Sequence, residues 1–143
     1  MVTALGTFLQ KLDEKGRIVL PSKARAELSE GGYLTRGQTH CVYLFSERQF
    51  QAYRDQMREQ VPEGMPAAAF NRLLFASVVS ITPDKTNRVS IPEPLRQYAR
   101  LERDLAVLGL EDRMEIWDAQ SWQDYQAKYE RQFSDLFGDE RDG

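Results

Sequence analysis

Residues 13–21 read DEKGRIVLP, and residues 84–92 read DKTNRVSIP. The two stretches share an aspartate, an arginine and a proline at equal spacing, and a second arginine follows each proline, at Arg25 and Arg96. Apolar residues alternate in the same way between the first arginine and the proline. Four identities at a constant offset of 71 residues indicate an internal duplication, and this duplication sets the fold.

The similarity between the two halves resumes further along the chain at an offset of 72 residues. Leu44-Phe45-Ser46 corresponds to Ile116-Trp117-Asp118, and Phe50 corresponds to Trp122. We therefore divide the chain into copy one (residues 5–51), a connector with a helix (52–76), copy two (77–123) and an acidic C-terminal helix or tail (124–143).

Each copy has the pattern of a small β-rich unit. Period-2 alternation predicts strands, proline ends a strand ladder, and Ser46 and Asp118 are typical helix N-caps. In copy one we expect strands at 7–12, 17–20, 33–35 and 41–45, and a short helix at 22–28. In copy two we expect strands at 77–82, 88–91, 105–109 and 113–117, and a helix at 92–101.

The expected fold class is α+β, with two tandem β-β-α-β-β half-units. Neither copy is long enough to bury its strands alone. We therefore expect the copies to pack about a pseudo-twofold axis and to close a small barrel with flanking helices. Gly16 and Asn87 occupy the same turn position, and both residue types tolerate positive φ.

Composition points to a cytoplasmic protein. No apolar run approaches the ~20 residues of a membrane-spanning helix, and Cys41 is the single cysteine. The net charge of −3 is unevenly distributed, since residues 111–143 hold ten acidic and four basic residues, whereas residues 1–110 hold 15 basic and 12 acidic ones. A locally basic face can therefore still bind phosphate.

The basic residues cluster around the repeated motif. Copy one contributes Lys11, Lys15, Arg17, Lys23 and Arg25, and copy two contributes Lys85, Arg88, Arg96, Arg100 and Arg103. Arginine binds guanine edges or phosphates in bidentate fashion, and lysine mainly neutralises phosphate. Asp13 and Asp84 have a plainer interpretation, in which they stabilise the turns and pair with Arg17 and Arg88.

We expect no catalytic residue, metal site or cofactor. His40 and Cys41 are the only histidine and cysteine, too few for a zinc site, which needs about three or four protein ligands. Trp117 and Trp122 are expected in the core. In the acidic segment, an amphipathic stripe of Tyr125, Tyr129, Phe133 and Leu136 could pack on its own barrel or on a neighbouring subunit.

The doubled motif, together with Glu115-Ile116-Trp117-Asp118, resembles the bacterial MraZ family of AbrB-like regulators. The resemblance covers nearly the whole chain. It implies a swapped-hairpin barrel, ring-shaped homo-oligomers and association with the nucleoid. It also implies binding to short direct repeats in double-stranded DNA upstream of the division and cell-wall gene cluster, which includes the regulator's own gene.

Positions matched to the family assign DNA contact to one set of residues: Lys11, Lys15, Arg17, Lys23, Arg25, Lys85, Arg88 and Arg96. Asp13, Gly16, Asp84 and Asn87 are assigned to the turns. Ala24 departs from the aromatic residue common at its position, and Asn87 and Ser90 make copy two the less typical half. The competing hypothesis is an antitoxin-like or protein-binding module that captures a partner with the acidic segment.

Overall fold

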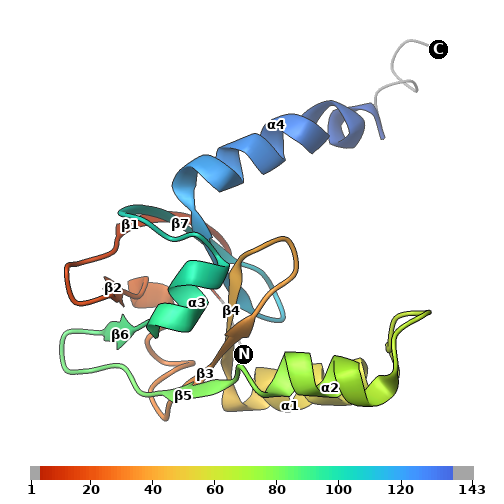
Figure 1. Cartoon of the computed structure of the whole chain (residues 1–143). Coiled ribbons are helices and arrows are strands. Elements are labelled where there is room, and N and C mark those ends of the chain that lie inside the picture. The colour runs from red at the N-terminus through yellow and green to blue at the C-terminus, as the bar shows by residue number, and fades with distance from the viewer. Residues whose placement is uncertain (1–3, 137–143) are drawn as a thin grey trace.

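The computed structural model describes residues 4–136 and has a mixed α+β fold, as expected (Figure 1). Copy one contains β1 (Gly6–Lys11), β2 (Arg17–Val19), the 3-10 turn η1 (Ser22–Ala24), β3 (Gly32–Arg36) and β4 (Val42–Ser46). Copy two contains β5 (Val79–Ile81), β6 (Arg88–Ser90), α3 (Glu93–Tyr98), β7 (Asp104–Gly109) and β8 (Met114–Asp118). Helices α1 (Glu47–Arg58) and α2 (Ala67–Phe75) connect the copies, and α4 (Ala119–Asp135) follows copy two.

The two copies exchange their first strands. β1 pairs antiparallel with β7 of copy two, and β5 pairs antiparallel with β3 of copy one. β4 pairs directly with β8, which gives one six-stranded sheet in the order β1-β7-β8-β4-β3-β5. β2 and β6 pair separately as a two-stranded ladder. Because the order is unchanged when the copies are interchanged, the fold has the expected pseudo-twofold relation.

The six-stranded sheet is open. β1 and β5 lie at its two edges, so the strand pairing of the described residues does not close into the barrel that we expected. The β2–β6 ladder instead lies against one face of the sheet, where the motif residues Ile18, Leu20, Val89 and Ile91 belong to the same buried core as Leu44.

Strict alternation along the central strands supplies two cores, one on each face of the sheet. In β4, Val42 and Leu44 face the core under the β2–β6 ladder, whereas Tyr43 and Phe45 face a second, aromatic core. Helix α1 covers this aromatic face with Phe50. The Ser46 hydroxyl accepts from the amide of Gln49, and the Gln49 side chain accepts from the amide of Ser46, so a capping box fixes the start of α1.

The expected helix at 22–28 is shorter than predicted. Only Ser22–Ala24 is a regular 3-10 turn, and the backbone then continues in irregular turns to Gly31, which has φ +99°. Seven residues are too few for a stable helix without strong packing. The chain must also approach β4 closely at Gly32, where a Cβ would lie 2.2 Å from the carbonyl oxygen of Phe45.

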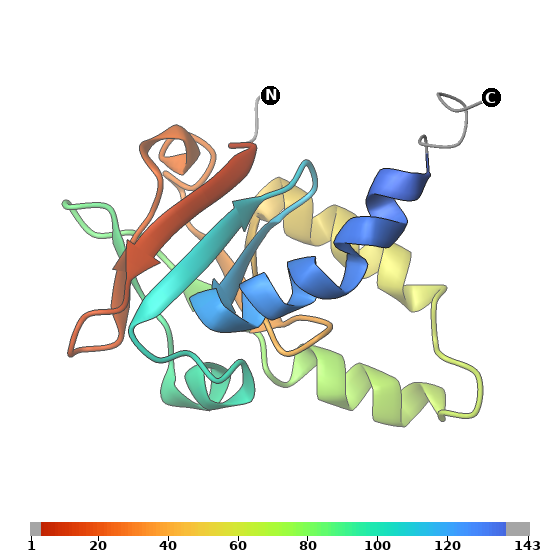
Figure 2. The ribbon, with the colours of Figure 1, turned by 90° about the horizontal axis from the view of Figure 1, so that it is seen from above.

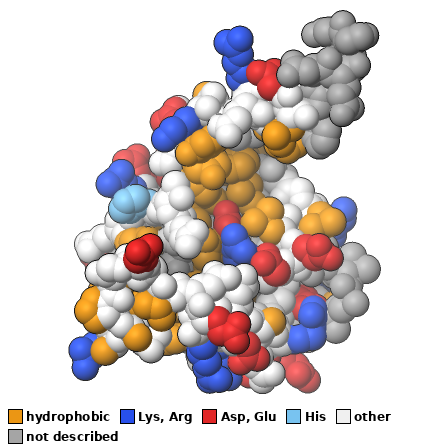
Figure 3. All heavy atoms as spheres, turned by 90° about the vertical axis from the view of Figure 1, so that its right-hand side faces the viewer, with side chains coloured by type: hydrophobic (Ala, Val, Ile, Leu, Met, Phe, Trp, Pro, Cys, Tyr) orange, Lys and Arg blue, Asp and Glu red, His pale blue; other side chains and the backbone are white. Residues whose placement is uncertain are grey.

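Helix α4 is anchored only at its base. The Asp118 carboxylate accepts from the amide of Ser121, and the rings of Trp122 and Tyr125 pack at an angle against Trp117, with centroids 5.3 and 5.0 Å away. Residues 126–136 are all exposed, and Figure 1 shows this part of α4 projecting away from the sheet. Figure 2 shows the same helix from above. Figure 3 shows hydrophobic side chains gathered in the upper part of the face from which α4 extends.

Candidate nucleic-acid interface

The two motif turns are built by the same hydrogen bonds. In the first motif turn (residues 13–16), Asp13 Oδ1 accepts from the amides of Lys15 and Arg17, each at 2.9 Å. In the second motif turn (residues 84–87), Asp84 Oδ1 accepts from the amides of Thr86 and Arg88, also at 2.9 Å.

Each turn closes on a residue with positive φ. Gly16 has φ +77° and Asn87 has φ +61°, and their amides donate to the carbonyl oxygens of Asp13 and Asp84. The motif therefore encodes one rigid turn twice, as the residue types at these positions predicted.

These bonds favour the charged form of both aspartates. Backbone hydrogen bonding at Arg17 is the largest cause that lowers the pKa of Asp13, and backbone hydrogen bonding at Arg88 is the largest for Asp84. Each carboxylate therefore remains ionised and keeps its turn closed throughout the neutral pH range.

The two motif arginines are oriented differently. Arg17 Nε donates to Asp13 Oδ2 at 2.9 Å, an ion pair in which both side chains remain about one-third exposed. Arg88 Nη1 instead donates to Thr86 Oγ1 at 2.7 Å, and that hydroxyl donates to Asp84 Oδ1 at 2.8 Å. Sequence reasoning missed Thr86, although a hydroxyl two residues after a turn aspartate is a recognisable signal.

The β2–β6 ladder places the turns at its two ends. Arg17 pairs with Ser90, and Val19 pairs with Arg88, so the antiparallel register puts one motif turn before each strand. In Figure 1 both turns project from the same edge of the molecule, which lies opposite α1 and α2. The amide of Ile91 bonds to the carbonyl of Gly16, and the amide of Leu20 bonds to the carbonyl of Asn87, so each turn is held by the other copy.

The predicted DNA-contact residues fall into three groups. Lys15, Lys23, Arg25 and Lys85 are exposed on or near the turns, and Arg17, Arg88 and Arg96 are half-buried. Lys11 is different, because its Nζ lies 2.8 Å from Oδ1 of Asp104, its partner across β1 and β7. This ion pair holds Lys11 at the sheet edge, and the hydrogen bond from Lys11 is the largest cause that lowers the pKa of Asp104.

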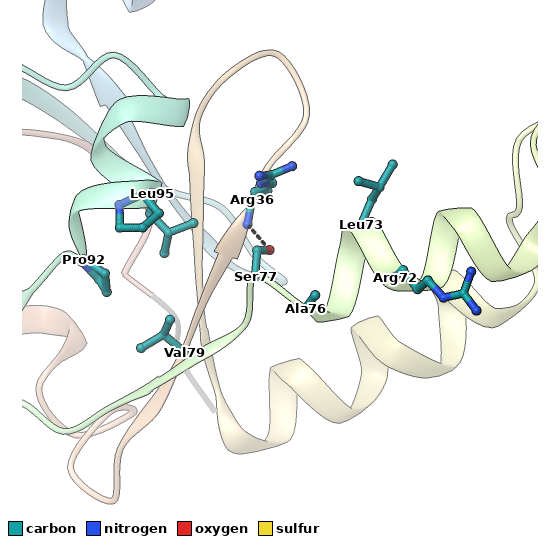
Figure 4. Close-up of a pocket in the computed structure, with 9 residues that line it drawn as sticks. Arg36, Arg72, Leu73, Ala76, Ser77, Val79, Pro92 and Leu95 are labelled. Carbon is teal, nitrogen blue, oxygen red and sulfur yellow. Dashed lines mark hydrogen bonds between the residues drawn. The ribbon is translucent and has the colours of Figure 1, made fainter.

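A pocket of about 310 Å³ lies where α2 leads into β5 (Figure 4). Its lining combines Arg36 and Arg72 with apolar residues and Ser77, and it contains no carboxylate, histidine or cysteine. The Ser77 hydroxyl donates to the carbonyl of Leu74 and lies 3.4 Å from the amide of Arg36. The polar groups of this pocket therefore hold the backbone in place and do not form a nucleophile–base pair.

Cys41 and His40 serve the β3–β4 connection. The Cys41 thiol is buried and donates to the carbonyl of Gln38, and burial raises its pKa far above the ordinary value. His40 Nδ1 lies 3.1 Å from the carbonyl oxygen of Tyr98. Within residues 4–136, no three metal-ligating side chains are grouped as a metal ion would require.

The duplicated motif agrees with comparison to known proteins. The family model described as "MraZ protein, putative antitoxin-like" matches residues 3–72 and again residues 74–141. The chain belongs to the MraZ family. The two matches correspond to the two copies with their following helices, so the MraZ unit is the structural repeat itself.

MraZ relatives extend over nearly the whole chain. The protein named transcriptional regulator MraZ from Leifsonia xyli subsp. xyli is 49% identical over 130 residues, which is 91% of each chain. Proteins of the same name from Micrococcus luteus and an Arthrobacter species are 47% and 49% identical over 131 residues, which is 92% of each chain. The shared name of these MraZ relatives supports a role in transcription regulation. Within the described residues no helix has the length and hydropathy to cross a membrane.

Proposed function

We propose that this chain is a sequence-specific DNA-binding transcription regulator that uses the β2–β6 ladder and its two motif turns to contact duplex DNA. The main support for this proposal is the repeated turn. At each end of one short ladder, an ionised aspartate orders the backbone next to an arginine. Ordering these arginines in advance reduces the entropy that binding would otherwise cost.

The charges around the ladder suit the two parts of a DNA interface. Exposed Lys15, Lys23 and Lys85 neutralise phosphates, a contribution independent of base sequence. Arg17 is held through Nε by Asp13, so its two terminal nitrogens are directed as a fork. Such a fork matches the guanine edge in the major groove or a phosphate.

The exposed half of α4 supports a homo-oligomer. Phe133 and Leu136 are 66% and 67% exposed, and Tyr129 lies one turn earlier on the same face. An unsupported helix of this length is marginal in water, so a partner surface is needed to stabilise it. In our proposal the partner is a second molecule of this chain, and successive molecules join head to tail into a ring.

Such an assembly explains how short operators are recognised. Tandem subunits engage tandem direct repeats, so individually weak contacts combine into useful affinity. We place these repeats upstream of the division and cell-wall gene cluster that includes the regulator's own gene, and the protein in the cytoplasm on the nucleoid. Regulation then follows from occupancy of the promoter and needs no cofactor.

Arg17→Ala and Arg88→Ala test this proposal, with Arg58→Ala as the matched control. Arg58 is exposed near the end of α1 and lies 3.7 Å from Asp55, far from the ladder in sequence and fold. We expect both motif variants to lose promoter binding at unchanged thermal stability, because the backbone bonds to the aspartates remain. Unfolding of the variants, or equal binding by all three, would contradict the proposal.

A second function is favoured by one observation, the acidic and apolar character of projecting α4. In an antitoxin-like module, this helix would capture a different protein, and DNA binding would be secondary. If deleting residues 126–143 abolishes a protein complex but leaves the affinity and stoichiometry on promoter DNA unchanged, the second function is supported over the first.

A further inference from the structure

Two pseudo-equivalent backbone carbonyls are satisfied by different residues. The carbonyl oxygen of Ile91, just after β6, accepts from Arg96 Nε at 2.8 Å. The carbonyl oxygen of Leu20 is its counterpart in copy one, and it accepts from Asn87 Nδ2 at 3.1 Å. The corner at the end of β6 (Ile91) is therefore held by an arginine from α3, and the corner at the end of β2 (Leu20) is held by an asparagine from the second motif turn.

The reason lies in the space above each turn. A Cβ on Gly16 would come within 2.9 Å of Arg96 Cζ and 3.0 Å of Arg96 Nε. The Arg96 side chain therefore occupies the volume that a side chain at position 16 would need. At the other corner Asn87 is itself buried and its amide group performs the task. The corner can thus be held in two ways. Either glycine at the turn position leaves room for an arginine from α3, or asparagine at the turn position makes the bond itself.

This difference changes the status of Arg25, the counterpart of Arg96 in the repeat. Because Asn87 already serves the Leu20 carbonyl, Arg25 is not needed there. Its side chain is exposed and makes no hydrogen bond or ion pair with any residue in the range 4–136. Arg96 is half-buried and engaged through Nε.

The charges near the two arginines differ as well, because Arg25 has a lysine nearby and Arg96 has a glutamate. Copy one has Ser22 and Lys23 three and two residues before Arg25, whereas copy two has Glu93 and Pro94 at the equivalent positions. Exposed Glu93 places a negative charge on α3, which opposes the approach of a phosphate. The surface around Arg25 is therefore more favourable for a polyanion than the surface around Arg96.

We infer that the two arginines have different tasks: Arg25 binds the DNA backbone, and Arg96 is a positioning residue that holds the first motif turn. The inference rests on the proposed DNA-binding function for Arg25 only. Through Gly16, Arg96 supports the turn that carries Lys15 and Arg17, so its contribution to DNA binding is indirect.

The test compares Arg25→Ala and Arg96→Ala by thermal unfolding and by binding to a labelled promoter duplex with direct repeats at several salt concentrations. For Arg25→Ala we expect an unchanged unfolding midpoint and roughly tenfold weaker binding. The slope of log affinity against log salt should also be lower by about one. For Arg96→Ala we expect the midpoint to fall by about 4 °C, because a buried carbonyl loses its donor. Binding should weaken as well, because the first motif turn is less ordered, but the salt slope should be unchanged.

A second pair of variants separates positioning from direct contact. Gly16→Asn combined with Arg96→Ala should restore both the midpoint and the binding, because asparagine at position 16 can donate to Ile91 as Asn87 donates to Leu20. Asparagine also tolerates the positive φ of this site. Asn87→Gly should weaken DNA binding, because it draws Arg25 onto the Leu20 carbonyl.

Two results would overturn the inference. Wild-type affinity in Arg25→Ala would remove Arg25 from the interface. Failure of Gly16→Asn to rescue Arg96→Ala, with a lowered salt slope and an unchanged midpoint, would make Arg96 a phosphate contact. If the wild-type protein binds no DNA, the proposed function and the Arg25 assignment both fail, while the midpoint and its rescue still decide the role of Arg96.

Discussion

The backbone amide of Ile91 donates a hydrogen bond to the carbonyl of Gly16 over 2.8 Å. The two residues belong to different copies of the repeat. Its counterpart joins the amide of Leu20 to the carbonyl of Asn87 at 2.9 Å. Each motif turn is therefore completed by a strand end from the other copy, and the candidate DNA surface exists only when both copies are folded together.

This mutual support predicts that one copy alone is not a folded monomer. In a fragment of residues 1–76, β1 loses its partner β7 and β2 loses its partner β6. We expect the fragment to be unfolded or to associate with a second fragment that replaces copy two. Circular dichroism with sedimentation equilibrium decides this, and a folded monomeric fragment would contradict the exchange of strands.

Gly16→Ala should destabilise the protein more than the same change at Gly64. Both residues have positive φ, +77° and +85°, so each substitution costs about 1 kcal/mol of backbone strain. Only at Gly16 does the new Cβ meet a neighbour, because nothing lies within 4 Å of a Cβ at Gly64. Denaturant unfolding should show an extra loss of about 1–2 kcal/mol for Gly16→Ala. Equal losses would show that Arg96 moves aside freely.

Stability should depend on pH through the turn aspartates. Hydrogen bonds from the backbone lower the folded-state pKa of Asp13 and Asp84 below the ordinary value of 3.8. A lowered pKa contributes stability above the unfolded-state pKa, and this contribution is lost as the pH falls through the folded-state pKa. Unfolding midpoints should therefore drop below about pH 4.

To test this pH effect, we would measure unfolding midpoints of the double variant Asp13→Asn/Asp84→Asn. The control is Asp55→Asn on α1. The unfolding midpoint of the turn variant should fall less between pH 5 and pH 2 than that of the wild type, because an amide does not titrate in this range. The Asp55 variant should follow the wild-type curve. Identical curves for all proteins would show that the turn carboxylates contribute nothing to the acid transition.

Phe133→Ser and Leu136→Ser should reduce the mass of the assembly without unfolding the chain. Both side chains are exposed in a single molecule of the chain, so their loss leaves the described cores intact. Sedimentation velocity measures the effect, with Gln132→Ser on the same helix as the control. An unchanged mass for the double variant would assign the apolar stripe to another partner.

The sequence predicted the strands and the turns because their signals are local. The apolar run at 41–45 is a local signal for a buried strand, and Asp13 with Gly16 carries its own turn geometry. The exchange of β1 onto β7 has no local signal, because it joins residues as far apart as Gly6 and Gly109, whose register depends on the whole core. The open sheet was missed for the same reason.

The roles of Arg25 and Arg96 could not be separated from the repeat alone, because the two residues are identical and equally spaced from their prolines. The difference arises at Gly16, which lies next to Arg96 only after folding, and at Asn87, which bonds to the Leu20 carbonyl of the other copy only after folding. Thr86 is a different case, because its signal is local and was overlooked: its hydroxyl takes the role toward Arg88 that the Asp13 carboxylate takes toward Arg17.

The most direct test of the account is binding of the wild-type protein to a promoter fragment with direct repeats and to a scrambled fragment of equal length, at two salt concentrations. We predict tighter binding to the repeats and weaker binding to both fragments at the higher salt, because specific contacts add to a phosphate component. Equal binding to both fragments, or no binding to either, would contradict the assignment of the two-turn surface to operator recognition.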